Sequence, residues 1–157
     1  MFLIKKNNLR YIKLNPIFFL VIFFLLFNFN SNSSESRAVL SVGNENAKVT
    51  VKVFSSLTCP HCANFHIKIF QKLKIDFVDN NNVKYEHHAF PLDLAALNAE
   101  KVLGCVENDE KKLKLLNELY KNQDSWASGS DINSINQKIF KISNNYGLNN
   151  DKNNSCL

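Results

Sequence analysis

Apolar and polar residues alternate along residues 47–54, and this period of two predicts a β-strand. From Cys59 onward the apolar positions recur every three or four residues, which predicts a helix. The residues expected along its apolar face are Cys62, Phe65, Ile69, Phe70 and Leu73. Alternation returns at residues 83–88 and predicts a second strand. Strand, helix and strand over this length predict a right-handed βαβ unit with parallel strands.

Residues 93–157 show mainly helical periodicity. Asp93, Asp109 and Asp131 each precede an apolar-periodic segment and are predicted to cap it, and Gly147 suits the end of the third helix. The positions expected to face inward are Ala95, Ala99, Val102, Val106, Leu113, Leu116, Leu119, Tyr120, Ile132, Ile135, Ile139 and Ile142. The lysines expected to face solvent are Lys111, Lys112 and Lys114.

The N-terminal residues 1–33 have the layout of a secretory signal, with basic residues followed by the apolar run Ile17–Phe27 and a polar stretch. Such a run is shorter than the roughly 20 residues that span a bilayer. Because Ser31-x-Ser33 is an imperfect small-residue cleavage site, the segment is predicted to be a signal peptide or an N-terminal anchor formed by residues 17–29. Residues 34–46, which contain Ser, Asn and Gly, are expected to be a flexible lead-in.

The net charge of +5 is concentrated in the leader. Residues 34–157 hold 15 Lys and Arg against 14 Asp and Glu, so the exported part has no basic excess that would favour nucleic-acid binding. All four cysteines also lie beyond the leader, in a part of the chain that would meet an oxidising compartment where disulfides persist.

The candidate chemistry lies where the first strand ends and the helix begins, at Cys59-Pro60-His61-Cys62. A helix N-terminus offers unpaired N–H groups and the positive end of the helix dipole, so Cys59 is expected to be the more exposed and more acidic thiol. Pro60 fits the first turn, and His61 adds a donor beside the sulfur. Cys62, one turn inside, is expected to close the disulfide. A stabilised thiolate makes such a disulfide oxidising.

A zinc site is the main alternative for a Cys-x-x-Cys pair, but no second pair is present. His66 is expected to be a packed histidine, and His87 and His88 should point to opposite faces of their strand. The sequence therefore predicts no metal and no cofactor. Cys105 and Cys156 are either two buried thiols or, preferred in an oxidising compartment, a structural disulfide.

The segment Phe54–His66, with Cys-Pro-His-Cys at its centre, resembles the active-site segment of bacterial DsbA-like thiol–disulfide oxidoreductases. Phe90-Pro91-Leu92 and the helical sequence after it resemble the helical insertion of that family. The resemblance implies an α/β fold of thioredoxin type, with its N-terminal half in residues 47–92 and an incomplete helical insertion in residues 93–157.

The same resemblance implies a function: oxidation of cysteines in unfolded exported proteins, in the periplasm, with a membrane redox partner for reoxidation. By position, Cys59 would be the nucleophile and Cys62 its partner, while Pro60 and His61 would tune the redox potential. Disulfide isomerisation or reduction on the same fold, and an inactive or metal-binding remnant, are the alternatives.

Two departures from the family pattern stand out. Val53 occupies the position six residues before the first active-site cysteine, where some relatives carry a buried acid, and this weakens the case for a reductase. No proline follows Pro91, whereas the family has a cis-proline loop followed by further strands. The chain is therefore expected to be truncated relative to the family, with the C-terminal strands and the cis-proline loop missing.

Overall fold

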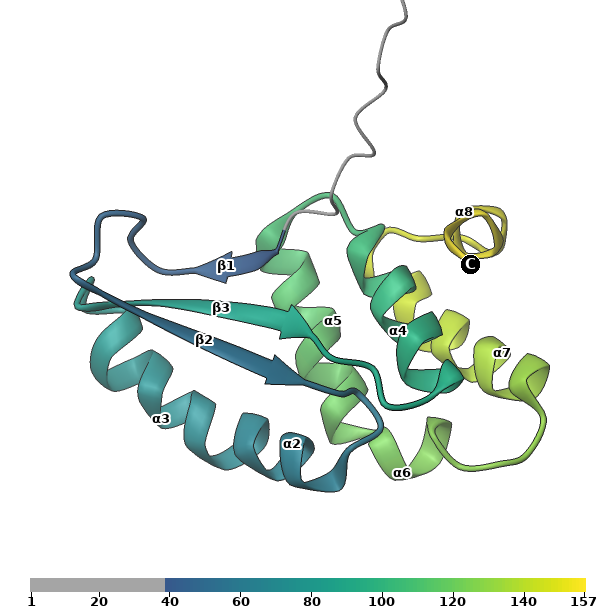
Figure 1. Cartoon of the computed structure of the whole chain (residues 1–157). Helices are drawn as coiled ribbons and strands as arrows, with labels where there is room; N and C mark the ends of the chain where they lie inside the picture. The colour runs from purple at the N-terminus through teal and green to yellow at the C-terminus, as the bar shows by residue number, and fades with distance from the viewer. Residues whose placement is uncertain (1–38) are drawn as a thin grey trace, which may run out of the picture. The chain divides into compact units, whose positions relative to one another are not determined.

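The computed structural model describes residues 39–157 (Figure 1). The predicted leader, residues 1–33, and the candidate anchor, residues 17–29, lie outside the described residues. Between residues 39 and 157, no helix has the length and apolar character needed to cross a membrane.

Three strands form one sheet in the order β1-β3-β2. β2 (Val49–Ser55) and β3 (Val83–Ala89) run parallel, with Val49 opposite Val83 and Ser55 opposite Ala89, as the βαβ prediction requires. β1 (Leu40–Val42) pairs antiparallel with β3 and places Leu40 opposite His87.

The expectation of a flexible lead-in over residues 34–46 is wrong at residues 40–42, which form β1. A strand of three residues is too short to show a period of two, and it exists here because β3 supplies its hydrogen-bonding partners. The turn after it needs Gly43, which has a φ of +106°. A Cβ at this position would lie 2.7 Å from the carbonyl oxygen of Val83.

The helix predicted from Cys59 begins at Pro60 and continues to Val78 without interruption. Its successive parts are α2 (Pro60–Asn64), η1 (Phe65–Phe70), α3 (Gln71–Leu73) and η2 (Lys74–Val78). Both η segments are wider π-helical turns, in which hydrogen bonds join residues five apart. The buried face includes Ala63, His66 and Phe70, whereas Ile69, predicted to face inward, is 52% exposed.

The long helix packs against one face of the sheet through Phe70 and Val78, which contact Val83 and Tyr85 of β3. The rings of Phe70 and Tyr85 lie 4.3 Å apart. The opposite face of the sheet carries mostly polar side chains, with Phe54 exposed among them. On that face Glu86 pairs with Lys84 at 3.2 Å and with Lys52 at 3.6 Å.

The rest of the described chain is helical, and its elements are α4 (Leu94–Gly104), α5 (Asp109–Lys121), α6 (Gln123–Trp126), α7 (Ile132–Ser143), η3 (Asn144–Tyr146) and α8 (Asn150–Cys156). Figure 1 shows these helices continuing from the end of β3, with α5 running behind the sheet. Together they enclose the larger apolar core, which includes Leu116, Trp126 and Ile139.

The predicted caps of two helices are present. Asp93 accepts a hydrogen bond from the N–H of Ala96 at 2.7 Å, and Asp131 accepts from the N–H of Ser134 at 3.0 Å. The prediction that Asp109 caps α5 is wrong, because the neighbouring Asn108 does so through the N–H of Lys111. Asn and Asp are equally good caps, so adjacent candidates cannot be separated by residue type alone.

Lys112 is the second departure in α5, since it is 6% exposed although it was expected to face solvent. Its ammonium pairs with Asp109 at 3.3 Å, while its aliphatic stem is covered. Because Asp109 is the first residue of α5 and not its cap, its carboxylate lies one turn before Lys112 and meets it there.

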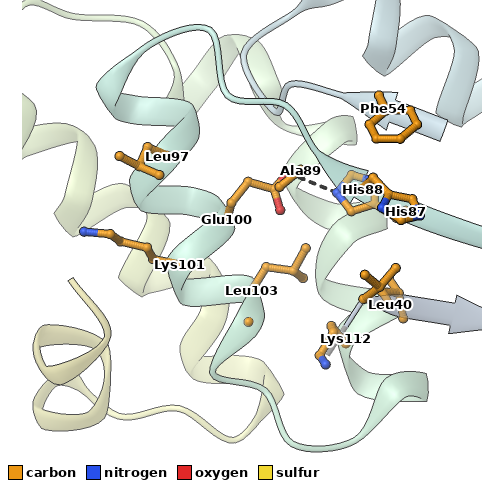
Figure 2. Close-up of a pocket in the computed structure, with 12 residues that line it drawn as sticks. Leu40, Phe54, His87, His88, Ala89, Leu97, Glu100, Lys101, Leu103 and Lys112 are labelled. Carbon is orange, nitrogen blue, oxygen red and sulfur yellow. Dashed lines mark hydrogen bonds and ion pairs between the residues drawn. The ribbon is translucent and has the colours of Figure 1, made fainter. Parts of the chain in front are cut away.

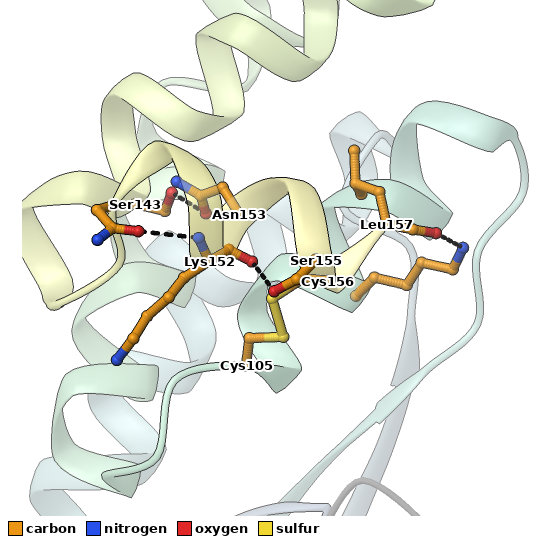
Figure 3. Close-up of a disulfide and its surroundings, with 9 residues drawn as sticks. Cys105, Ser143, Lys152, Asn153, Ser155, Cys156 and Leu157 are labelled. Atoms are coloured by element: carbon orange, nitrogen blue, oxygen red, sulfur yellow. Dashed lines mark hydrogen bonds between the residues drawn. A yellow bond between two sulfur atoms is a disulfide. The ribbon is translucent and has the colours of Figure 1, made fainter.

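A disulfide joins Cys105, at the C-terminal end of α4, to Cys156 in α8 (Figure 3). Their Cα atoms are 6.3 Å apart, within the roughly 7 Å that a disulfide can bridge. Beside it, Asn153 accepts a hydrogen bond from the buried hydroxyl of Ser143 at 2.9 Å. The last helix is therefore fastened to the helical core both covalently and by buried polar contacts.

Candidate redox site

Cys59 is the residue immediately before α2, in an extended conformation with φ −82° and ψ 119°. Its carbonyl accepts the first helical hydrogen bond, from the N–H of Ala63 at 3.1 Å. Pro60 is at the start of the helix, where its missing N–H leaves no bond unmade. The thiol of Cys59 is thus at the positive end of a helix, the position that the sequence predicted for it.

The pKa values of the two thiols are shifted in opposite directions. The backbone N–H of Cys62 chiefly lowers the pKa of Cys59, and the Cys62 thiol and the N–H of His61 add to this effect. Burial raises the pKa of Cys62, and the neighbouring Cys59 thiol raises it further. Both cysteines are free thiols in this structure, and Cys62 packs against the helical core. Pro60 and His61, in contrast, are exposed.

The loop before the pair is tied to the segment that enters α4. The hydroxyl of Thr58 donates to Asp93 Oδ2 at 2.6 Å, while the other carboxylate oxygen of Asp93 caps α4. The N–H of Phe90 donates to the carbonyl of Ser55 at 2.9 Å. The sequence predicted the cap but not the second role of Asp93, because that contact joins residues 35 positions apart.

A chain of buried hydrogen bonds runs beneath this loop. Tyr120 Oη donates to Ser55 Oγ at 2.9 Å, and Ser55 Oγ is 3.3 Å from His87 Nδ1. His87 Nε2 is in turn 3.0 Å from Glu100 Oε1. With the Ser55 hydroxyl as donor to Nδ1 and the Nε2–H as donor to Glu100, one consistent set of donors runs from the phenol to the carboxylate. Burial raises the pKa of Tyr120, which keeps the phenol protonated as the first donor.

Figure 2 shows His87 and Glu100 meeting from β3 and α4 at the wall of a cavity of about 340 Å³. The cavity is otherwise mostly apolar, with Leu40, Leu97 and Leu103 among its lining residues. His88, the strand neighbour of His87, is stacked on Phe54 with ring centroids 4.8 Å apart. Val53, six residues before Cys59, is opposite His87 in the sheet register and packs with Phe70 and Tyr85.

His66 is a buried core residue, as expected. Its ring stacks on Phe70 at 4.6 Å and lies 4.7 Å from the ring of Tyr120. His66 Nε2 is 2.7 Å from Asn117 Oδ1, which also accepts from Gln71 Nε2, so the imidazole nitrogen is the donor. Burial lowers the pKa of His66 to about 4, and the ring is therefore neutral near pH 7. Within residues 39–157, no three His, Cys, Asp or Glu side chains converge as metal ligands.

Comparison with known proteins agrees with this geometry. The family model described as Thioredoxin matches residues 35–157, and the chain belongs to this family. Within it the chain is DsbA-like. The crystal structure of alpha-DsbA1 from Wolbachia pipientis is 28% identical with a TM-score of 0.67, and the match covers 75% of this chain and 58% of that one.

Two further relatives extend the comparison. A protein of Rickettsia bellii, named provisionally as a protein-disulfide oxidoreductase, is 33% identical over 87 residues, which make up 55% of this chain and 33% of the relative. The structure of oxidised BdbD from Bacillus subtilis has a TM-score of 0.67 at 19% identity, covers 75% of this chain and 65% of that one, and shares the fold. The matched part of the chain spans about a third of the Rickettsia protein.

Proposed function

We propose that this protein is a thiol–disulfide oxidoreductase that introduces disulfides into exported proteins through Cys59 and Cys62. The observation that carries the proposal is the unequal pair of thiols at the start of α2. The pKa of Cys59 is lowered by backbone N–H groups, and that of Cys62 is raised by burial. An acidic, accessible thiol beside a less acidic, packed one is the arrangement that thiol–disulfide exchange requires.

In the proposed reaction the pair begins as a disulfide. A substrate thiolate attacks the sulfur of Cys59 and forms a mixed disulfide, while Cys62 leaves as a thiolate and takes up a proton because its pKa is raised. A second substrate thiolate then attacks the substrate sulfur of the mixed disulfide and expels Cys59 as a stabilised thiolate. The substrate loses two electrons and two protons. The pair gains both electrons and one proton, and the other proton is released.

The stabilised Cys59 thiolate supports an oxidase, because a stable reduced form makes the disulfide a stronger oxidant. Val53 at the position of the buried acid supports the same direction. The exposed Pro60 and His61 would tune the potential through the helix start and through the donor that His61 carries. The substrates would be unfolded exported proteins, and a membrane redox partner would reoxidise the pair.

Export to the periplasm rests on the basic and apolar pattern of residues 1–33. Fusion of this segment to a reporter enzyme that is active only outside the cytoplasm tests it directly. An active fusion with a processed N-terminus would indicate a signal peptide, and an active unprocessed one an anchor. An inactive fusion would remove export from the proposal.

The activity itself is tested by equilibrating the full chain with glutathione buffers and by following the oxidation of a dithiol peptide. We expect a reduction potential above about −200 mV, compared with about −270 mV for a thioredoxin-type reductase. C59S and C62S variants should both abolish peptide oxidation, and C105A/C156A, which keeps the reactive pair, should retain it. A potential near the thioredoxin value, or peptide oxidation that survives C59S, would contradict the proposal.

A further inference from the structure

The short helix α6 contacts the loop that carries the reactive thiol. Gln123, its first residue, is 6% exposed. Its side-chain Nε2 donates to the carbonyl of Leu57 at 2.8 Å and to the carbonyl of Cys59 at 3.1 Å. Both hydrogens of one buried amide are therefore used on the backbone on either side of Thr58.

α6 is in turn anchored in the helical core. Trp126, the last residue of the helix, is fully buried, and its Nε1 donates to the carbonyl of Leu119 at 2.7 Å. The carbonyl of Gln123 accepts from the N–H of Ala127 at 2.8 Å. Because Trp126 anchors α6 in the core, Gln123 is held beside the loop, and its amide links the loop to the helical core.

The contact has an electrostatic consequence for Cys59. The Cys59 carbonyl is attached to the same residue as the reactive sulfur, and its oxygen is the negative end of a dipole. The N–H of Ala63 and the amide of Gln123 both donate to that oxygen and offset its partial negative charge. They also fix the backbone angles that place the thiol before the N–H groups of His61 and Cys62, the groups that lower its pKa.

We propose that Gln123 is a positioning residue for the redox pair: through its two hydrogen bonds, the helical part of the chain sets the acidity and the oxidising strength of Cys59. The inference rests on the proposed function and deepens it. It assigns to the helical part a direct influence on the chemistry, through a residue 64 positions from the nucleophile in sequence.

The test replaces the amide by side chains of similar size in the full chain. Q123M removes both donors, and Q123E, when ionised, offers only acceptors and adds a negative charge. Q71M is the matched control, because Gln71 is a partly buried glutamine on the same side of the sheet whose amide donates to Asn117 and not to the loop. The measurements are the pH dependence of Cys59 alkylation, the equilibrium with glutathione, and Tm.

We expect Q123M to raise the pKa of Cys59 by at least half a unit. Because the thiolate is then less stable, the equilibrium constant for oxidising glutathione should fall about threefold. Q123E should shift both quantities further in the same direction, and Q71M should leave both unchanged. A purely structural role would lower Tm alone. If Q123M does not fold, Q123E decides the question by the same two readouts.

The proposed function and the role of Gln123 can be refuted separately. An ordinary pKa for Cys59 in the unmodified protein would overturn the proposed function itself. An acidic Cys59 in the unmodified protein whose pKa and potential do not change in Q123M and Q123E would overturn the role of Gln123 and leave the proposed function standing. A shift of equal size in Q71M would also overturn it.

Discussion

Removal of the Cys105–Cys156 disulfide should lower the free energy of unfolding by several kcal/mol. The bond closes a loop with a sequence separation of 51 between the end of α4 and α8. Restriction of the unfolded chain by a loop of this length contributes about 4 kcal/mol to the free energy of unfolding in the loop-entropy description. For the roughly 120 described residues this corresponds to a fall in Tm of about 10–20 °C.

The measurement is urea unfolding of C105A/C156A in a C59S/C62S background, so that the reactive pair cannot form its own bond. The same background with the disulfide intact, and again after reduction, provides the two controls. The reduced protein should match the alanine variant within about 1 kcal/mol, because the alanines remove little buried volume. A difference of under about 1 kcal/mol between the intact and reduced proteins would refute the loop-closure reasoning. Two reactive thiols at these positions in the native protein would show that the bond is not formed.

Three further predictions follow from the site and its neighbours. In the reduced protein Cys59 should be alkylated before Cys62, at a pH well below the ~8.5 of a free thiol, and faster labelling of Cys62 would contradict the assigned acidities. His66, whose pKa is lowered to about 4 in the fold, should contribute stability that is present above about pH 6.5 and lost as the pH falls through 4. Between pH 7 and pH 4, the free energy of unfolding of an H66F variant should therefore fall by about 3 kcal/mol less than that of the unmodified protein. The same pH dependence of the urea midpoint in both proteins would refute this. D93A removes both a helix cap and the hydrogen bond to Thr58, and should lower the free energy of unfolding by about 2 kcal/mol. D131A removes a cap only and should lower it by about 1 kcal/mol. Equal urea midpoints for the two variants would contradict the second role of Asp93.

The features that sequence reasoning captured are those with local causes. The period of two predicted β2 and β3, and Cys-x-x-Cys at a strand-to-helix junction placed Cys59 before α2. Caps at Asp93 and Asp131 were also predictable, because each satisfies the N–H groups of its own first turn.

The missed features depend on contacts between distant segments. β1 exists through pairing with β3, and its three residues carry no periodic signal. Ile69 is exposed because the long helix packs through Ala63, His66 and Phe70 instead, and the sequence period alone does not decide between the two adjacent faces. Gln123 looks like an ordinary surface glutamine in the sequence, and only the packing of α6 brings its amide to the carbonyls of Leu57 and Cys59.

The buried chain from Tyr120 to Glu100 has a consequence for how this sequence can vary. Its four members come from α5, β2, β3 and α4, and each forms a hydrogen bond with the next. Replacing one member leaves its neighbour buried without a partner, and this costs more than the bond itself contributed. Replacing two adjacent members by apolar residues removes the orphan and restores part of the loss. Substitutions at these four positions are therefore expected to be correlated among related chains. Adjacent members should change from polar to apolar together and not one at a time.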